Sequence, residues 1–248
     1  MALYRFGKKA AVHDPRTLKF AAYLKPSLPP APDAYSSLDR IATNLNLPDA
    51  TPLFPIDGND TKGDCTIAGA AHLVTNWRGL VGLNYVPPEN DVVTKYFEMT
   101  GGEDSGLVLL DVLKYWRKYG LFGDTIGGFV KVDHNNIEHI KLAIYLFGGV
   151  YTGFIVQQNA IQNFENGIPW TAGPPDPEGG GHCISGMAYR NGLYRFATWG
   201  AFQDADESFL HSCVDEMYAV IPPEASSEKF DPGFDLATLQ KDIYAIAA

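Results

Sequence analysis

Two short segments, far apart in the sequence, contain residues suited to nucleophilic chemistry. Cys65 lies in DGNDTKGDCTIAGAAH, where turn-forming residues give way to a helical pattern. Peptide N–H groups and the helix dipole stabilise a thiolate there, so the pattern predicts a lowered cysteine pKa. His182 opens a strand-like segment after three glycines, in GGGHCISGMAY. A thiol nucleophile needs a base that is close in space, and a separation of 117 positions in the sequence is typical of a two-lobed site.

Each segment alone has a simpler structural interpretation. Cys65 is also a typical small buried residue at a helix start, and His182 a typical histidine at the edge of a hairpin. His72 lies nearer in sequence, but seven helical residues carry it about 10 Å along the axis from Cys65. Only the combination of Cys65 with His182 favours a cysteine–histidine pair across a cleft.

Metal sites have weaker support in the sequence. Asp57, Asn59 and Asp60 suggest a calcium loop, but the position that requires glycine is Lys62, and the position of the bidentate glutamate is Ala68. His182–Cys183 and His211–Ser212–Cys213 lack the spacing of a zinc finger. We therefore predict no metal and no other cofactor. Cys183 and Cys213 are interpreted as core residues.

The periodicity changes from helical to extended along the chain. We predict helices over 66–80, 90–99, 106–119 and 135–147, and strands over 150–156, 183–189, 193–199 and 214–221. A short helix near 160–164 and a closing helix over 235–247 complete the pattern. Helices first and strands second indicate an α+β fold, with a helical lobe over about 51–148 and an antiparallel β lobe over about 149–222.

The first 50 residues form a proline-rich N-terminal arm. Eight of the 17 prolines lie within residues 1–55, and only 36–45 has helical spacing, with Ser37 as the expected cap. Leu18, Phe20 and Tyr23 are apolar. We therefore expect the arm to pack on the body formed by 51–248, with a mobile tail as the alternative.

In sequence order, GDCTIA, GGGHCISGMAY and ATWG resemble the motifs of papain-like cysteine peptidases. The likeness extends to HDPRTLKFAAYL, LFGGVY and GFDLATL and indicates a bacterial and tailed-phage branch of that superfamily. It implies a two-lobed papain-like fold in which the central helix carries the cysteine. It also implies a cysteine peptidase, hydrolase or acyl-transfer enzyme that acts on a peptide or amide bond.

The resemblance assigns a role to each site residue. Cys65 is the nucleophile, His182 the base, and Asn59 stands where the family has a glutamine that donates to the oxyanion. Trp199 is expected to shield His182. The position of the family's orienting asparagine is Ala197, which leaves the triad incomplete; Thr198 is expected on the opposite strand face. Another side chain such as Asp60 or Asp64 is a further candidate to assist.

Composition excludes several other classes of protein. The 248 residues carry 19 Lys and Arg against 29 Asp and Glu, for a net charge of −10 without a basic cluster, so we expect no nucleic-acid partner and no membrane partner. Three cysteines favour a reduced compartment. Without a signal peptide in MALYRFGKK, we expect a bacterial cytoplasmic or virion-associated protein with a peptide or protein substrate. The alternative is a non-catalytic docking module that contacts other structural proteins of a phage virion or prophage.

Overall fold

The structure, a computed structural model, describes residues 4–222 and 233–247. The helices are α1 (Ser37–Asn44), α2 (Cys65–Leu80), α3 (Glu89–Thr100), α4 (Leu109–Tyr119), α5 (Ile137–Phe147), α6 (Ala160–Glu165), α7 (Glu207–Ser212) and α9 (Leu236–Ala247), with 3-10 helices η1 (Phe20–Tyr23) and η2 (Thr51–Leu53). The strands are β1 (Tyr35–Ser36), β2 (Gly128–Lys131), β3 (Val150–Ile155), β4 (Gly181–Arg190), β5 (Leu193–Thr198), β6 (Ala201–Asp206) and β7 (Val214–Ile221). Residues 1–3 of the predicted arm and 223–232 of the predicted body lie outside the described residues.

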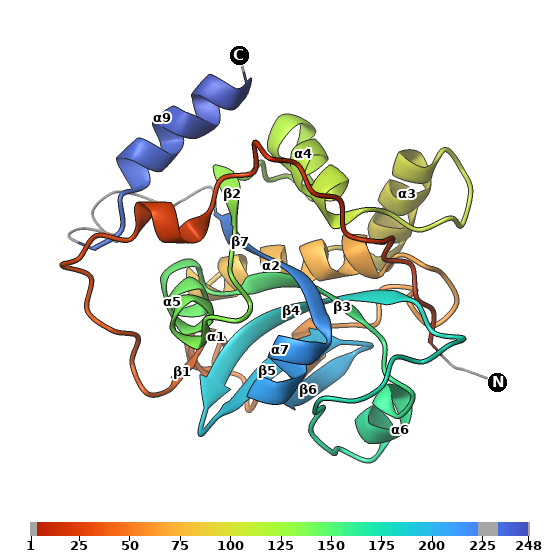
Figure 1. The fold of residues 1–248 in the computed structure, drawn as a ribbon. Helices are drawn as coiled ribbons and strands as arrows, with labels where there is room; N and C mark the ends of the chain where they lie inside the picture. Colours follow the sequence, from red (N-terminus) through yellow and green to blue (C-terminus); the bar gives the residue numbers. More distant parts are fainter. Residues whose placement is uncertain (1–3, 223–232, 248) are drawn as a thin grey trace.

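An antiparallel sheet organises the molecule. Its strands run in the order β2-β7-β3-β4-β5-β6, and the short β1 pairs with β4. Figure 1 shows the curved sheet with α2 behind it and α7 in front. Alternate side chains of each strand point to opposite faces, so the sheet separates two apolar cores.

The two cores correspond to the two faces of this sheet. One contains α2, α3 and α4 together with Tyr151, Cys183, Ala197 and Tyr218 from the strands. The other contains α5, α7, α9 and η1 with residues such as Phe154 and Ile184. The helix α2 lies close to the sheet because Gly69 has no side chain. A Cβ there would lie 3.1 Å from Cys183 Sγ and 3.2 Å from the Tyr151 ring.

The helices and strands agree closely with those expected from periodicity. The four main helices and four main strands occur within three residues of the predicted bounds. The sequence pattern missed β1, β2, β6 and α7, and it placed the cap of α1 one residue late. Ser36, not Ser37, caps this helix, because its side chain accepts from the Asp39 N–H at 3.0 Å, whereas Ser37 Oγ donates to Met187 O.

The N-terminal arm lies along the body. It begins beside the β lobe, passes α3 and α4, and reaches η1 near α9 (Figure 1). Phe20 and Tyr23 of η1 are buried, and Phe20 stacks on Phe234. Along the described ranges, 4–222 and 233–247, no helix is long and apolar enough to cross a lipid bilayer.

Candidate active site

Cys65 is the first residue of α2, directly after the turns formed by residues 57–64. Its side chain is buried at the junction of the two lobes. The peptide groups of Gly7 and Cys183 face the thiol, one from the arm and one from β4. Because Cys183 directly follows His182, the helix start and the histidine strand meet at this end of the sheet. No hydrogen bond joins Cys65 to His182 within the described part of the chain.

His182 lies in an aromatic enclosure. Its ring stacks on Trp199, with centroids 4.5 Å apart and planes at 21°, and meets the edges of Phe6 and Phe154. Trp199 has a φ of 45°, a left-handed conformation that is rare for a bulky residue and concentrates at functional sites. This backbone turn follows β5 directly. It places the indole over the imidazole.

Thr198 makes the polar contact to His182. The distance between His182 Nε2 and Thr198 Oγ1 is 2.8 Å, while His182 Nδ1 has no hydrogen-bond partner among the described residues. The expectation that Thr198 faces away from His182 is therefore wrong. In the β4–β5 register, Ala197 lies opposite Ser185 and faces the helical lobe, so the alternation places Thr198 on the other face, with His182.

This register also predicts the effect of an asparagine at Ala197. The site is 1% exposed and belongs to the core of the helical lobe, so Ala197→Asn adds volume and an amide without partners. We expect this variant to lose about 2–4 kcal/mol of unfolding free energy and to gain no activity. Ala201→Asn, on the half-buried edge strand, is the matched control. Thermal unfolding measures both; an unchanged melting temperature for Ala197→Asn would contradict the register.

Residues of the arm run through the junction between the lobes. Leu107 N donates to Gly7 O at 2.8 Å, and Lys9 N donates to Leu107 O at 2.9 Å on the helical side. Lys8 N donates to Gly181 O at 3.0 Å on the sheet side. The segment is thus paired through its backbone with both lobes, as an extended peptide would be when it binds in a groove.

Gly7 is required for this close passage. A Cβ on Gly7 would lie 1.7 Å from Gly63 O, a backbone atom that cannot turn away as a side chain can. On the N-terminal side of Gly7 the arm makes aromatic contacts. Tyr4 stacks on Trp199 at 4.6 Å, and Phe6 meets His182. Phe6 therefore lies against His182, and the peptide group of the next residue, Gly7, faces Cys65.

Asn59 is positioned by the arm and by its own loop. Its Nδ2 donates to Arg5 O at 3.2 Å and to Lys62 O at 3.0 Å, and its backbone carbonyl accepts from Arg5 N. One N–H of the amide that was expected to stabilise an oxyanion is thus directed at a carbonyl oxygen of the arm.

No protein-family model matches the sequence, and no curated protein matches it significantly. Solved structures do. Xylellain, a cysteine protease from Xylella fastidiosa, matches with a TM-score of 0.66 at 15% identity, over 89% of this chain and 97% of its own. Procathepsin L 3 from the Tenebrio molitor midgut matches with a TM-score of 0.60 at 12% identity, over 89% and 77%. ProCathepsin B S9 from Trypanosoma congolense matches with a TM-score of 0.56 at 12% identity, over 87% and 86%.

The chain has a papain-like fold. Both the α+β class and the papain-like architecture expected from the sequence are confirmed. The expected bacterial and tailed-phage branch stays a prediction. At these identities the likeness concerns the fold, so the chemistry of the site has to be argued from its own residues.

Cys65 and His182 are both neutral where the arm covers them. Burial raises the pKa of Cys65 to about 11, although the peptide groups of Gly7 and Cys183 act in the opposite direction. Burial lowers the pKa of His182 to about 3. The expectation of a lowered cysteine pKa is therefore wrong for this state. Because the thiol is shielded from water, the peptide N–H groups at the helix start do not compensate for the desolvation cost of a thiolate.

Asp64, the residue before Cys65, has a buried carboxyl group whose two oxygens lack hydrogen-bond partners among the described residues. Burial raises its pKa to about 7. The folded protein thus holds a proton on Asp64 between pH 3.8 and about 7 that the unfolded chain releases. This contribution to stability grows as the pH falls through that range.

His182 contributes with the opposite sign. Below about pH 6.5 the unfolded chain protonates this histidine, whereas the folded protein does not until about pH 3, so its contribution is lost on acidification. Asp64→Asn removes the stabilisation that the buried Asp64 carboxyl group provides as the pH falls. Its melting temperature should fall more than that of the unchanged protein between about pH 7 and about pH 4.5, and that of His182→Gln should fall less. If the melting temperature changed with pH in the same way for the unchanged protein and both variants, these assignments would be contradicted.

The remaining candidates lie outside this junction. His72 Nε2 lies 2.9 Å from Pro55 O and 3.4 Å from Asp57 Oδ2, within the helical lobe. Cys183 and Cys213 are buried free thiols. In the described ranges no three His, Cys, Asp or Glu side chains are grouped as metal ligands.

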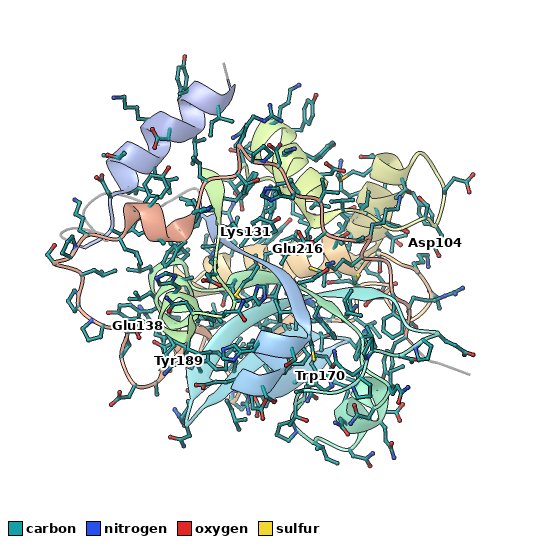
Figure 2. All side chains as sticks on the ribbon, in the orientation of Figure 1. Asp104, Lys131, Glu138, Trp170, Tyr189 and Glu216 are labelled. Carbon is teal, nitrogen blue, oxygen red and sulfur yellow. The ribbon has the colours of Figure 1, made fainter. Side chains whose placement is uncertain are left out.

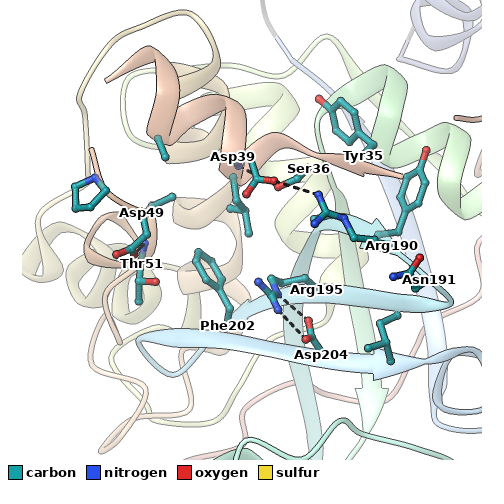
Figure 3. Close-up of a pocket in the computed structure, with 17 residues that line it drawn as sticks. Tyr35, Ser36, Asp39, Asp49, Thr51, Arg190, Asn191, Arg195, Phe202 and Asp204 are labelled. Carbon is teal, nitrogen blue, oxygen red and sulfur yellow. Dashed lines mark hydrogen bonds and ion pairs between the residues drawn. The ribbon is translucent and has the colours of Figure 1, made fainter. Parts of the chain in front are cut away.

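A separate pocket of about 360 Å³ lies where α1 meets the end of the sheet (Figure 3). Its two arginines already have partners. Arg195 forms a bidentate ion pair with Asp204, and Arg190 Nη2 lies 3.7 Å from Asp39 Oδ2. These pairs neutralise the cations, and the pocket contains none of the residues of the cysteine–histidine site.

Proposed function

We propose that this protein is a cysteine peptidase or related hydrolase of papain-like fold, held inactive by its own N-terminal arm. The observation that carries the proposal is the position of Phe6 and Gly7. Phe6 lies against the His182 ring, and the peptide group of the next residue faces the Cys65 thiol. A cleft that binds one extended peptide by backbone pairing to both lobes is suited to bind another.

The proposed reaction uses His182 as base through Nδ1. With Nε2–H donated to Thr198, Nδ1 carries the lone pair and takes the proton from Cys65 Sγ. The sulfur forms a bond to the carbonyl carbon of the substrate, and Asn59 with the Cys65 N–H donates to the oxyanion. The carbon–nitrogen bond then breaks as His182 returns the proton to the leaving amine. Water hydrolyses the thioester, releases the acid and restores the thiol.

The arm itself presents no electrophile to this pair. The Gly7 group that faces the thiol is an N–H, because it acts to lower the cysteine pKa. The arm pairs with Leu107 on the helical side and with Gly181 on the sheet side. Because it is held on both sides, an uncut arm occludes the cleft and shields Cys65 from water.

A mechanism-based thiol probe tests the proposal. We expect a peptidyl vinyl sulfone to label Cys65 alone after residues 1–12 of the arm have been cut off and removed, with the adduct located by mass spectrometry. Cys65→Ala is the matched control and should abolish both labelling and peptide hydrolysis. Cys183 and Cys213 serve as internal standards, since their labelling reports unfolding. An arm-free protein that neither reacts with the probe nor cleaves a peptide library would favour the docking module instead.

Thr198 provides a further test of the catalytic arrangement. Thr198→Val keeps the shape of the side chain but removes the only hydrogen bond to His182 Nε2 among the described contacts. We expect kcat/KM of the released enzyme to fall about 10- to 100-fold, mainly in kcat, because the imidazole loses its orientation and tautomer. Thr198→Ser retains the hydroxyl and should recover most of the loss. Equal rates for the valine and serine variants would rule out this role.

A further inference from the structure

The side chain of Lys8 is completely buried although it belongs to the arm. It enters the sheet side of the cleft, and its Nζ lies 2.7 Å from Asp215 Oδ2 and 3.3 Å from Glu216 Oε1. The ammonium also donates to Lys9 O at 3.2 Å. An isolated buried ammonium is costly in free energy, so these carboxylates make its burial possible.

The sheet has a local irregularity that brings two consecutive carboxylates to one ammonium. Gly153 pairs with Glu216, but the next residue, Phe154, pairs with Val214, so Asp215 is left without an opposite residue. Such a β-bulge turns a side chain out of its normal alternation. Asp215 can then reach the same group as Glu216, which its place in a regular strand would prevent.

Glu216 forms the base of this pocket. Its side chain is 1% exposed, and Tyr218 Oη donates to its Oε2 at 2.9 Å, which holds it in place. Its Oε1 accepts no hydrogen bond from any residue that the structure describes, and it lies 3.3 Å from Lys8 Nζ. Figure 2 labels Glu216 near the middle of the molecule, on β7. Burial raises the pKa of this carboxyl, and Lys8 acts to lower it.

Gly153 makes room for the long side chain. A Cβ at this position would lie 2.1 Å from Lys8 Cε and 3.0 Å from Glu216 Cγ. The Lys8 side chain therefore fits between β3 and β7 because β3 has glycine at this point, and it meets two carboxylates because of the bulge on β7. Lys8 follows Gly7, whose N–H faces Cys65, so the pocket adjoins the candidate nucleophile.

We propose that this pocket is a specificity site that selects a lysine or arginine side chain within two residues of the scissile bond. The inference rests on the proposed peptidase function. Lys8 occupies the pocket in the closed state, and a basic substrate side chain takes its place when the arm leaves. A buried carboxylate at the base favours a cation over an apolar chain of equal length.

A set of matched probes tests this selection in a chain that is cut at a protease recognition site inserted within the exposed residues 10–13. Peptidyl vinyl sulfones carry lysine, arginine, norleucine or glutamate at each of the two positions next to the electrophile, and every rate is divided by the iodoacetamide rate of the same protein. We expect lysine and arginine to react at least about 10-fold faster than norleucine at one position, with glutamate slowest. In Glu216→Gln the normalised preference should fall severalfold. A cleaved protein that reacts with iodoacetamide but prefers norleucine would overturn the pocket and not the peptidase.

A second measurement requires no reaction at the thiol. In the uncut chain, the amides of residues 5–9 should stay protected from hydrogen exchange in Lys8→Arg. In Lys8→Met the same amides should exchange at least about 10-fold faster. Gly153→Ala, which fills the pocket, should expose them as well. Faster exchange in Lys8→Arg than in Lys8→Met would overturn the proposal, even for a protein that proved to have no peptidase activity.

Discussion

Cleavage of the chain within residues 10–13 is expected to raise the rate of Cys65 labelling by at least about 100-fold. These residues are exposed, so an inserted recognition site for a specific protease is accessible there. While the arm is tethered, its effective concentration at the cleft is on the order of millimolar. After the cut, dilution to nanomolar protein lets the arm peptide dissociate. Water then reaches Cys65 and His182. The desolvation that raises the pKa of Cys65 and lowers the pKa of His182 is thereby removed.

Two controls make this result specific to the arm. The same recognition site placed within residues 82–85, an exposed loop of the helical lobe, should leave the labelling rate unchanged after cutting. A synthetic peptide of residues 1–12 should restore protection, whereas the same peptide with Gly7→Ala should not, because its Cβ would collide with Gly63 O. If Cys65 stays unreactive after the arm peptide has been removed, the arm does not close the site.

The sequence indicated the elements that carry the two candidate residues because their local patterns are strong. Cys65 follows a turn-rich segment at the start of a long apolar helix, and His182 follows three glycines at the start of a buried strand. Both patterns depend on neighbouring residues. The helix and strand bounds around them were predictable for the same reason, whereas β6, with the polar sequence AFQDAD, has little apolar alternation to reveal it.

The course of the arm was not predictable from sequence. Residues 7–9 bind through peptide N–H and C=O groups, which every residue carries and which leave no side-chain signature. Burial by this segment then reverses the expected pKa of Cys65. Nor does the Lys8–Lys9 pair reveal that only one of the two ammonium groups is buried, since the bulge that brings Asp215 to Lys8 depends on how two distant strands pair.

The orientation of Thr198 depended on register in the same way. Alternation can be counted from sequence only when one residue of each strand is known to pair, and β4 contains a register shift between Gly186 and Ala188. With Ser185 opposite Ala197, the hydroxyl of the next residue reaches the histidine. A threonine beside the missing asparagine was visible in the sequence, but its partner was not.

Reversal of the charge at Lys8 is expected to open the site in the uncut chain. Lys8→Glu would place a third carboxylate against Asp215 and Glu216 in a buried pocket, where loss of one partner of an ion pair typically costs about 3–5 kcal/mol. This cost weakens the binding of the arm in the cleft by the same amount of free energy. The rate of Cys65 labelling by iodoacetamide should therefore rise about 100-fold or more.

Lys9→Glu is the matched control, because it makes the same charge change on the adjacent exposed residue, whose described contacts involve only its backbone. We expect little change in its labelling rate. Addition of Glu216→Lys to Lys8→Glu restores opposite charges at the base of the pocket and should recover part of the protection. Cys183 and Cys213 must stay unlabelled throughout, since their reaction would report unfolding and not release of the arm. Equal rates for the Lys8 and Lys9 variants would show that the pocket does not hold the arm, because only Lys8 reaches its carboxylates.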